Sequence, residues 1–524
     1  MLVLTTSGTA AAELHPAVVE ADLAGVPLIV CTADRPPELH EVGAAQTIDQ
    51  LRIFGRAPRA SFDLGVPDEA TRARWRPYAA RLVAESMHGP RGPGPVHANL
   101  PFRDPLTGAL GTAEAATGRG GGDLASGYQQ VTGPGGASAA AIAAMLEITA
   151  SARGVVLAGG GAGAGAGVLP AIVELAALLG WPVLADPRAW PRRPFANVVA
   201  AGDGILRAAA GALALRPEVV VHVGAPHASQ VIAGWCRSSA AAGTEHVLID
   251  PFGRYLDPDR LATRVIVADP TALAEGVLEQ FRSSAGGRLI DDAWIASWQR
   301  AELAAQHAID ELLATNDAIS EPALARRLFA LLPPESTVVA SSSMPIRDLE
   351  WFAKPRADAP RVLANRGANG IDGVTSTVLG VAAARSALGG PVVGLVGDLA
   401  FLHDVSALVW GRDEVRPDAV IVVVDNDGGG IFNFLGYAAA LEHDVFERGF
   451  ATAQSCEIAT VARAFGCSVI ELDSLSGFDE VIEKASGTRG ITVVVAATER
   501  RSNVELHGAL NAAIAAAVDA ALAD

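Results

Sequence analysis

Two short stretches of the chain carry oxygen-bearing side chains directly after apolar runs. Gly397-Asp398 follows the run from Pro391 to Val396, and Asp425-Asn426 follows the run from Ala419 to Val424. Asp398 and Asn426 are 28 positions apart, with glycines beside both. Mg²⁺ takes such carboxylate and amide oxygens together with phosphate oxygens and water, and glycine lets the backbone approach a phosphate. The pair predicts a Mg²⁺-diphosphate site; the alternative is two polar strand ends with turn glycines.

The two apolar runs are the elements that must position this pair. Both are rich in β-branched residues without alternation, as is typical of buried parallel strands. The chain between them is long enough for one crossover helix, which predicts a β-α-β unit. The ends of the two strands would then meet at the carboxyl edge of one sheet, where open α/β folds bind ligands.

Two further polar loops also follow short apolar runs. They are Ser341 to Asp348, with the sequence SSSMPIRD, and Asn365 to Gly373, with the sequence NRGANGIDG. Together with Asp398 and Asn426 they predict four loops at one sheet edge. Arg347 and Arg366 would bring local positive charge, and the arginine fork binds carboxylates bidentately.

Composition limits the class of protein. The chain has 524 residues, half of them apolar, and a net charge of −18, which predicts two to four domains and argues against nucleic-acid or anionic-membrane partners. The four cysteines show no C-x-x-C spacing, so we expect reduced thiols and neither a disulfide framework nor a zinc site. Without a basic N-terminal region or an apolar run of about 18 residues, we expect a cytoplasmic protein with no membrane insertion.

Strand and helix patterns alternate in three blocks, which predicts an α/β fold of three doubly wound, Rossmann-like domains with parallel sheets. We expect an N-terminal domain over 1–106, a Gly/Ala/Ser-rich linker over 107–137, a central domain over 138–285 and a C-terminal domain over 286–524. In the central block, Gly161, Gly163 and Ala166 loosely match a dinucleotide-binding turn, with Asp186 after the next strand. A purely structural layer is the favoured interpretation, and bound NAD or FAD is the alternative.

Several motifs resemble those of the MenD family, a branch of the thiamin diphosphate-dependent enzymes. Gly397-Asp398 followed by Asn426 looks like the thiamin diphosphate motif, with Leu399 in place of the glycine of the general pattern. The other matches span nearly the whole chain in family order. They are TTSGTA (5–10), TADRPPEL (32–39), QTIDQ (46–50), SMPIRD (343–348), NRGANGIDG (365–373), GDLAFLHD (397–404) and GGGIF (428–432).

The resemblance implies a reaction and its participants. Enzymes of this family make 2-succinyl-5-enolpyruvyl-6-hydroxy-3-cyclohexene-1-carboxylate for menaquinone biosynthesis, by decarboxylation of 2-oxoglutarate and 1,4-addition of the remaining carbanion to isochorismate. They use thiamin diphosphate with Mg²⁺ or Mn²⁺, and the cofactor carries the difficult chemistry. The first of their three domains is the pyrimidine-binding one and the last binds the diphosphate. Because their sites form between subunits, the resemblance implies a homodimer or tetramer.

The resemblance also implies roles for individual residues of this chain. Asp398, Asn426 and the Gly428 carbonyl would hold the metal, and Ile371 would bend the cofactor. The cofactor would also contact Gly397, Leu399, Ala400 and Ile431. Arg347 and Arg366 would act in catalysis by facing the substrate carboxylates. Further substrate contacts would come from Ser343, Gln46, Arg35, Arg254, Phe432 and Leu435.

Two departures from the family pattern affect these expectations. Ala45 stands where the family usually has Asn, which removes one polar contact near the substrate. The family segment whose Glu activates the cofactor lies upstream of TTSGTA, and here that motif starts at Thr5. We therefore expect that the printed chain is N-terminally truncated relative to the family and lacks the activating Glu. The alternatives are another thiamin diphosphate-dependent 2-oxoacid decarboxylase or synthase, and a non-catalytic remnant that still binds the cofactor.

Overall fold

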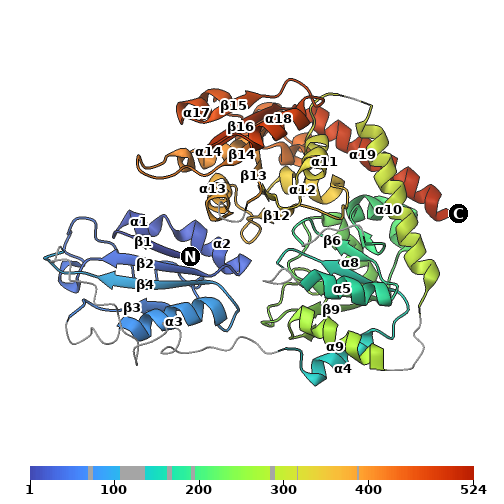
Figure 1. Ribbon diagram of the computed structural model, residues 1–524, viewed down its shortest axis with the longest axis horizontal. Helices are drawn as coiled ribbons and strands as arrows, with labels where there is room; N and C mark the ends of the chain where they lie inside the picture. The colour runs from blue at the N-terminus through green and yellow to red at the C-terminus, as the bar shows by residue number, and fades with distance from the viewer. Residues whose placement is uncertain are drawn as a thin grey trace. The chain divides into compact units, whose positions relative to one another are not determined.

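Strands and helices alternate along the chain in the computed structural model (Figure 1). The structure describes residues 1–68, 75–106, 136–161, 168–189, 195–283, 290–315, 317–385 and 389–523. These residues form two units. The first comprises Met1–Gly135 with Arg366–Asn369, and the second comprises Gly136–Asn365 with Gly370–Asp524.

The N-terminal unit is built on a four-stranded parallel sheet of order β1-β2-β4-β3. Its strands are β1 (Leu2–Thr5), β2 (Leu28–Asp34), β3 (Ser61–Asp63) and β4 (Pro95–Pro101). Its helices are α1 (Thr9–Ala12), α2 (His15–Ala24), the short η1 (Pro37–Leu39) and α3 (Trp75–His88). Val18 and Ala21 of α2 pack with Leu28 and Val30 of β2 in a small core.

The second unit contains a central sheet of six parallel strands, in the order β10-β9-β8-β5-β6-β7. Its strands are β5 (Gly154–Ala158), β6 (Val183–Ala185), β7 (Val198–Val199), β8 (Val219–Val223), β9 (Glu245–Ile249) and β10 (Arg264–Ile266). One face packs against α4 (Ala139–Ile148), α5 (Val168–Leu178) and α9 (Pro270–Ser283). The other face packs against α6 (Gly202–Arg207), α8 (Gln230–Ala241), α10 (Asp292–Leu313) and α19 (Arg500–Ala523), with α7 (Ala209–Ala214) beside α6 and α19.

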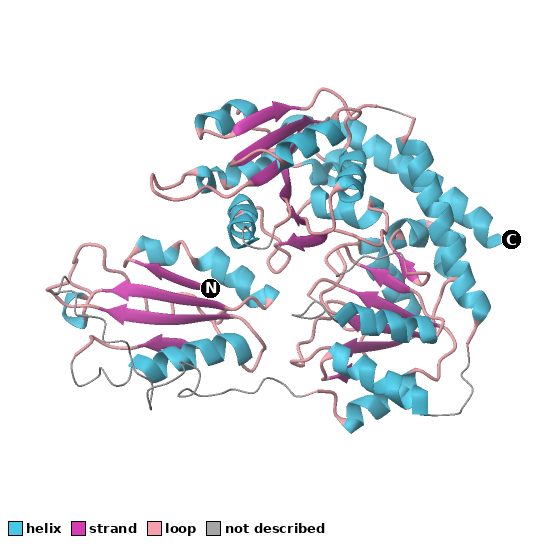
Figure 2. Cartoon of the chain, viewed as in Figure 1, coloured by secondary structure: helices cyan, strands magenta, loops and turns pink. Residues whose placement is uncertain are grey.

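A C-terminal sheet in the same unit has six parallel strands in the order β12-β11-β13-β14-β16-β15. Figure 2 distinguishes strands, helices and loops by colour along the described chain. Its strands are β11 (Thr337–Ala340), β12 (Arg361–Ala364), β13 (Val392–Gly397), β14 (Ala419–Asp425), β15 (Ser468–Glu471) and β16 (Ile491–Ala497). One face packs against α11 (Glu321–Leu331), α12 (Met344–Phe352) and α18 (Phe478–Ser486). The other packs against α13 (Val374–Arg385), α14 (Asp398–His403) and α17 (Ile458–Ala464).

Short elements fill the connections near the carboxyl edge of the C-terminal sheet. They are η3 (Val405–Leu408), η4 (Gly430–Phe434), α15 (Tyr437–Ala440), α16 (His443–Phe446) and η5 (Glu447–Ala451). The predicted β-α-β unit is confirmed, because β13 pairs with β14 in parallel and α14 and η3 lie between them in the chain.

The long C-terminal helix α19 is a packing element of the second unit. Its buried residues include His507, Leu510, Ile514 and Val518, a stripe with helical spacing that joins the core shared with α10. Among the described residues, α19 is the one helix that is long and apolar enough to cross a membrane. A single helix of this kind is weak evidence for a membrane span, because buried core helices meet the same criteria.

The predicted fold class is confirmed, since all three sheets are parallel and alternate with helices. Parts of two further predictions lie outside the described residues: Gly163 and Ala166 of the dinucleotide-like turn, and the linker as far as residue 135.

Candidate active site

The ends of β13 and β14 bring Asp398 and Asn426 to one edge of the C-terminal sheet. Gly397, the last residue of β13, is in register with Val424 of β14. Asp398 then opens α14, and Asn426 follows the last residue of β14. Both side chains are buried, with 5% and 8% of their surface exposed. The fold therefore gathers the predicted pair at the edge where parallel sheets bind ligands.

Backbone N–H groups fix the Asp398 carboxylate. The Leu399 N–H donates to Oδ1 over 2.8 Å and the Gly428 N–H donates to Oδ2 over 2.6 Å. Burial raises the pKa of Asp398 to about 6; the two N–H bonds oppose this rise, and the carboxylates of Asp425 and Asp427 add to it. The carboxylate is thus held in one orientation, and burial and neighbouring carboxylates raise its pKa.

The two ends of the Asn426 side chain have different environments. Its Nδ2 donates to Oε1 of Glu321, the first residue of α11, over 2.8 Å. Its Oδ1 is buried and has no hydrogen-bond partner among the described residues. Burial raises the pKa of Glu321 to about 7, and the nearby Asp348 adds to this rise. The bond to Glu321 fixes which end of the amide is nitrogen, so the oxygen is left for a ligand.

Side chains are excluded at Gly428 and Gly430 in the loop after Asn426. Gly428 has a φ of +130°, and a Cβ built there would lie 2.3 Å from the Ala451 carbonyl oxygen. A Cβ at Gly430 would lie 2.7 Å from Nδ2 of Asn426. Side chains at these positions would collide with the loop or displace the amide, so the glycines keep the backbone close to Asp398 and Asn426.

This donor set fits a metal-bound diphosphate. Asp398 offers carboxylate oxygens, and Asn426 offers a buried amide oxygen that has no hydrogen-bond partner among the described residues. The Gly428 carbonyl, the predicted third ligand, accepts the Gly430 N–H over 2.9 Å. These are hard oxygen donors of the type that Mg²⁺ or Mn²⁺ selects. A dication would also offset the negative charge of Asp398, Asp425 and Asp427, which the described loop leaves close together.

Apolar residues predicted to face the cofactor lie on nearby elements of the same unit. Ile371 is partly buried and packs against the core between the C-terminal sheet and α13. Ile431 and Phe432 lie in η4, and the Phe432 ring meets Phe450 edge to face, with centroids 5.6 Å apart. Leu435 follows η4 and is 45% exposed.

Ser343 and Arg347 lie at the start of α12, after strand β11. Ser343 has a φ of +75°, which is strained for a residue with a side chain. Arg347 Nη1 donates to the Ser343 carbonyl over 2.6 Å. Burial lowers the pKa of Arg347, while Glu350 and Asp348 oppose this, and a guanidinium in such a place keeps its charge. The guanidinium of Arg347 is thus held against the backbone of the strained turn at Ser343.

The remaining predicted substrate residues are divided between the two units. Gln46 of the N-terminal unit has a φ of +59°, and its Nε2 donates to Thr6 Oγ1 over 3.0 Å and to the Ser7 carbonyl over 2.9 Å. In the same unit, the Arg35 N–H donates to Asp34 Oδ1 over 2.7 Å. Arg366 opens the segment Arg366–Asn369, which groups with this unit.

Arg254 lies beyond β9 of the central sheet. Its Nη2 forms an ion pair with Asp250 Oδ2 at 2.8 Å, and its guanidinium lies 5.4 Å from the centre of the Phe252 ring. The Asp250 partner already occupies the guanidinium fork, so a substrate carboxylate would have to compete with it.

Sequence reasoning missed Glu321. Ser320 and Pro322, on either side of it, are recognisable helix-start signals. Those signals place Glu321 at the start of a helix, but they do not say that it points at the amide of a residue 105 positions away.

Comparisons with known proteins agree with this geometry. Residues 137–339 match a family model described as the middle domain of thiamine pyrophosphate, and residues 351–496 match the C-terminal TPP binding domain of thiamine pyrophosphate enzymes. The chain is 39% identical to a 2-succinyl-5-enolpyruvyl-6-hydroxy-3-cyclohexene-1-carboxylate synthase of Halobacterium salinarum, over 96% of this chain and 85% of that protein. Synthases of the same name from Thermobifida fusca and Listeria innocua are 38% and 34% identical, over 98% and 99% of this chain and 86% and 87% of those proteins.

Proposed function

The chain belongs to the family of 2-succinyl-5-enolpyruvyl-6-hydroxy-3-cyclohexene-1-carboxylate synthases, and on that premise we propose that it catalyses this step of menaquinone biosynthesis. In the proposed reaction 2-oxoglutarate loses CO₂, and the remaining four-carbon unit adds 1,4 to isochorismate. The observation that carries the proposal is the buried Asn426 Oδ1, which has no hydrogen-bond partner in the part of the chain that the structure describes and lies at the same sheet edge as the oriented Asp398 carboxylate.

Asp398, Asn426 and the Gly428 carbonyl would hold Mg²⁺ or Mn²⁺ on the diphosphate of thiamin diphosphate. When bound, the cofactor supplies a thiazolium ring that stabilises negative charge on the former keto carbon. Gly397, Leu399 and Ala400 would contact it from the start of α14. Ile371 and Ile431 would supply apolar surface against its rings, which excludes water and orients the reactive carbon.

Arginines would recognise the substrates. Both substrates are dianions, whereas the protein has a net charge of −18, so cations must be concentrated where the substrates bind. We assign Arg347 and Arg366 to substrate carboxylates, with Ser343 and Gln46 as hydrogen-bonding partners. Phe432 and Leu435 would line the apolar side of the pocket. Arg35 and Arg254 are the outer candidates, and Arg254 would first have to release Asp250.

The proposal also covers the domain boundaries, the cellular location and the oligomeric state. The domains would be 1–106, 138–285 and 286–524, joined by a linker over 107–137. The protein would act in the cytoplasm as a homodimer or tetramer, because the sites of the family it resembles form between subunits. Sedimentation velocity of the purified protein with thiamin diphosphate and Mg²⁺ measures this state, and a monomer at all concentrations would contradict it.

Product analysis tests the reaction. The full-length protein is incubated with thiamin diphosphate, Mg²⁺, 2-oxoglutarate and isochorismate, and the products are identified by mass spectrometry. We expect the adduct and one CO₂ per adduct. Succinic semialdehyde with CO₂ and no adduct would indicate a simple decarboxylase instead, and cofactor binding without turnover would indicate a non-catalytic remnant.

A further inference from the structure

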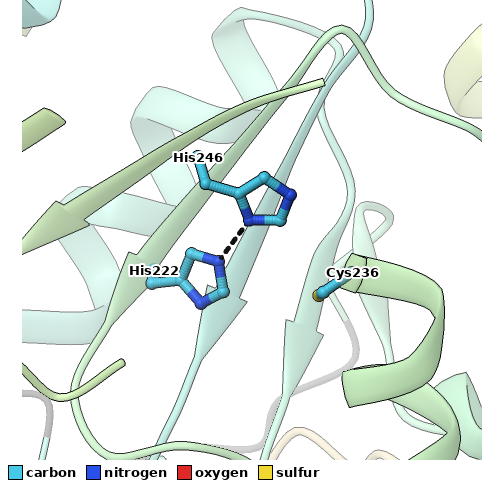
Figure 3. A group of neighbouring side chains, drawn as sticks. All are labelled: His222, Cys236 and His246. Carbon is cyan, nitrogen blue, oxygen red and sulfur yellow. Dashed lines mark hydrogen bonds between the residues drawn. The ribbon is translucent and has the colours of Figure 1, made fainter. Parts of the chain in front are cut away.

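Three side chains with metal-binding atoms meet at the central sheet, away from the Asp398 site (Figure 3). They are His222 on β8, His246 on β9 and Cys236 on α8. The nitrogen and sulfur atoms that could bind one ion all lie within 4.8 Å of one another. Sequence spacing gave no sign of this group, because its members come from three separate elements.

The fold explains why these side chains meet. His222 is in register with Leu248 and His246 with Val220, so the two histidines are diagonal neighbours on one face of adjacent parallel strands. Helix α8 covers that face and buries Ile232, Trp235 and Cys236 against it. The Cys236 side chain points toward the two rings (Figure 3).

The histidine pair lies beside the apolar core that packs under α8. His222 Nε2 and His246 Nδ1 are 3.0 Å apart, as in a hydrogen bond. His246 is fully buried, and its Nε2 has no hydrogen-bond partner among the described residues. Burying such groups costs free energy unless they are paired. The two imidazoles satisfy each other through their facing nitrogens, and the same two nitrogens face each other at a distance that one bound ion could span.

The ligand chemistry favours a borderline-soft dication. Burial lowers the pKa of His222 to about 3 and also lowers that of His246, so both imidazoles are neutral, as metal ligands must be. Cys236 is 3% exposed, and burial followed by the charge of Asp259 raises its pKa to about 12. Two imidazoles and a thiolate match Zn²⁺, whereas the oxygen donors around Asp398 match Mg²⁺.

A carboxylate, that of Asp257, borders the same cavity as His222 and Cys236. His222, Cys236 and Asp257 line one cavity of about 60 Å³. The negative charge of Asp257 acts to raise the pKa of both histidines, so it lies close enough to stabilise a cation there. One thiolate and one carboxylate would balance the charge of Zn²⁺, so the occupied site would carry no net charge.

We propose that His222, Cys236 and His246 form a structural zinc site that ties α8 to β8 and β9, with its fourth position facing Asp257. Binding would break the Cys236 S–H bond and release that proton to solvent. The proton shared by the two rings would move to the other nitrogen of its own ring. Two nitrogen ligands at about 2.0 Å from a tetrahedral ion lie roughly 3.3 Å apart, and the two histidine nitrogens already lie 3.0 Å apart. On binding, the Cys236 sulfur is therefore the atom that has to move closer to the ion.

Cobalt titration of the metal-free, full-length protein tests the site. We expect one Co²⁺ per chain to produce a thiolate-to-cobalt charge-transfer band and intense tetrahedral bands, and Zn²⁺ to remove them. Cys236→Ser should abolish the charge-transfer band, and His222→Gln should weaken binding by at least about tenfold. Cys467→Ser, at a buried free cysteine of the C-terminal sheet, is the matched control and should keep both signals.

A second measurement keeps the test valid if the Cys236 variant does not fold. X-ray absorption of the zinc-loaded wild-type protein should show nitrogen ligands with one sulfur, and thermal unfolding should shift upward with Zn²⁺. The proposal is overturned if the wild-type protein gives no charge-transfer band, if folded Cys236→Ser retains it, or if zinc has only oxygen ligands. None of these outcomes depends on turnover at the Asp398 site.

Discussion

The Asn426 amide shows how one neighbouring residue can prepare a ligand atom. Its Nδ2 is bonded to Glu321, and its Oδ1 is left buried and without a partner among the described residues. An amide that could rotate would present nitrogen or oxygen to a metal, and only oxygen can bind. Glu321 is thus a positioning residue, and its effect should appear in metal-dependent cofactor binding rather than in substrate affinity.

Two substitutions at Glu321 distinguish its orienting of the Asn426 amide from the mere filling of space by a buried side chain. Glu321→Ala should weaken Mg²⁺-dependent thiamin diphosphate binding by about 10- to 100-fold, as expected when a partner of a metal ligand is removed. Glu321→Gln keeps an oxygen that accepts the Nδ2 bond and should bind close to the wild-type value. Calorimetric titration measures both. Equal loss in the two variants, or none in Glu321→Ala, would contradict the role.

Arg347 should act on substrate and not on cofactor. Arg347→Lys keeps the charge but loses the planar fork, so KM for one substrate should rise about tenfold, equivalent to about 1.4 kcal/mol. Arg347→Ala should raise it further, while thiamin diphosphate affinity stays unchanged in both. Steady-state kinetics with each substrate varied in turn measures this. Lost cofactor binding with unchanged KM would show that the Ser343–Arg347 turn serves the cofactor instead.

At the scale of elements, the strand pattern was enough to predict the position of Asp398 and Asn426. Apolar, unalternating runs ending in Gly397-Asp398 and Asp425-Asn426 became neighbouring parallel strands. Contacts between elements distant in the chain could not be predicted in this way. The Glu321 bond and the His222, Cys236 and His246 cluster depend on how α11 and α8 pack, and periodicity does not encode helix rotation against a distant strand.

The loop between β14 and η4 should tolerate no side chain at Gly428. A Cβ there would collide with the Ala451 carbonyl, and the φ of +130° is itself unfavourable for other residues. Gly428→Ala should destabilise the protein by about 1–3 kcal/mol and abolish Mg²⁺-dependent cofactor binding.

Gly436 provides the matched control for that substitution. It lies at the other end of η4, its φ is −56°, and a Cβ built there would meet nothing within 4 Å. Gly436→Ala should therefore unfold at the wild-type urea midpoint and bind cofactor normally. If both variants, followed by urea unfolding and calorimetry, behave like the wild-type protein, the loop is not constrained as described.

At the scale of the whole molecule, α19 connects parts of the second unit that are far apart in sequence. Its buried stripe packs against α10, and its His507 Nε2 lies 2.7 Å from Oδ1 of Asp348 on α12. Both side chains are only 2% exposed. Burial alone would lower the pKa of His507, but the charge and hydrogen bond of Asp348, the Asn503 carbonyl and Glu321 raise it.

This raised pKa fixes the sign of a pH dependence. The contribution of protonated His507 to stability is fully present below about pH 6.5, its unfolded pKa, and is lost as pH rises through the higher folded value. The stability difference between wild-type protein and His507→Gln should therefore be larger at acidic than at alkaline pH. Urea unfolding at several pH values measures it, and a difference that grows with pH would refute the assignment.

The most direct test of the account concerns Asp398, because the proposed function requires it to hold a metal-bound diphosphate. Thiamin diphosphate is titrated into the full-length protein by calorimetry, with and without Mg²⁺, and into Asp398→Asn, which keeps the shape and removes the charge. We expect binding only with Mg²⁺ in the wild-type protein and at least about 100-fold weaker binding in the variant. Metal-independent binding, or equal affinity in the two proteins, would contradict it.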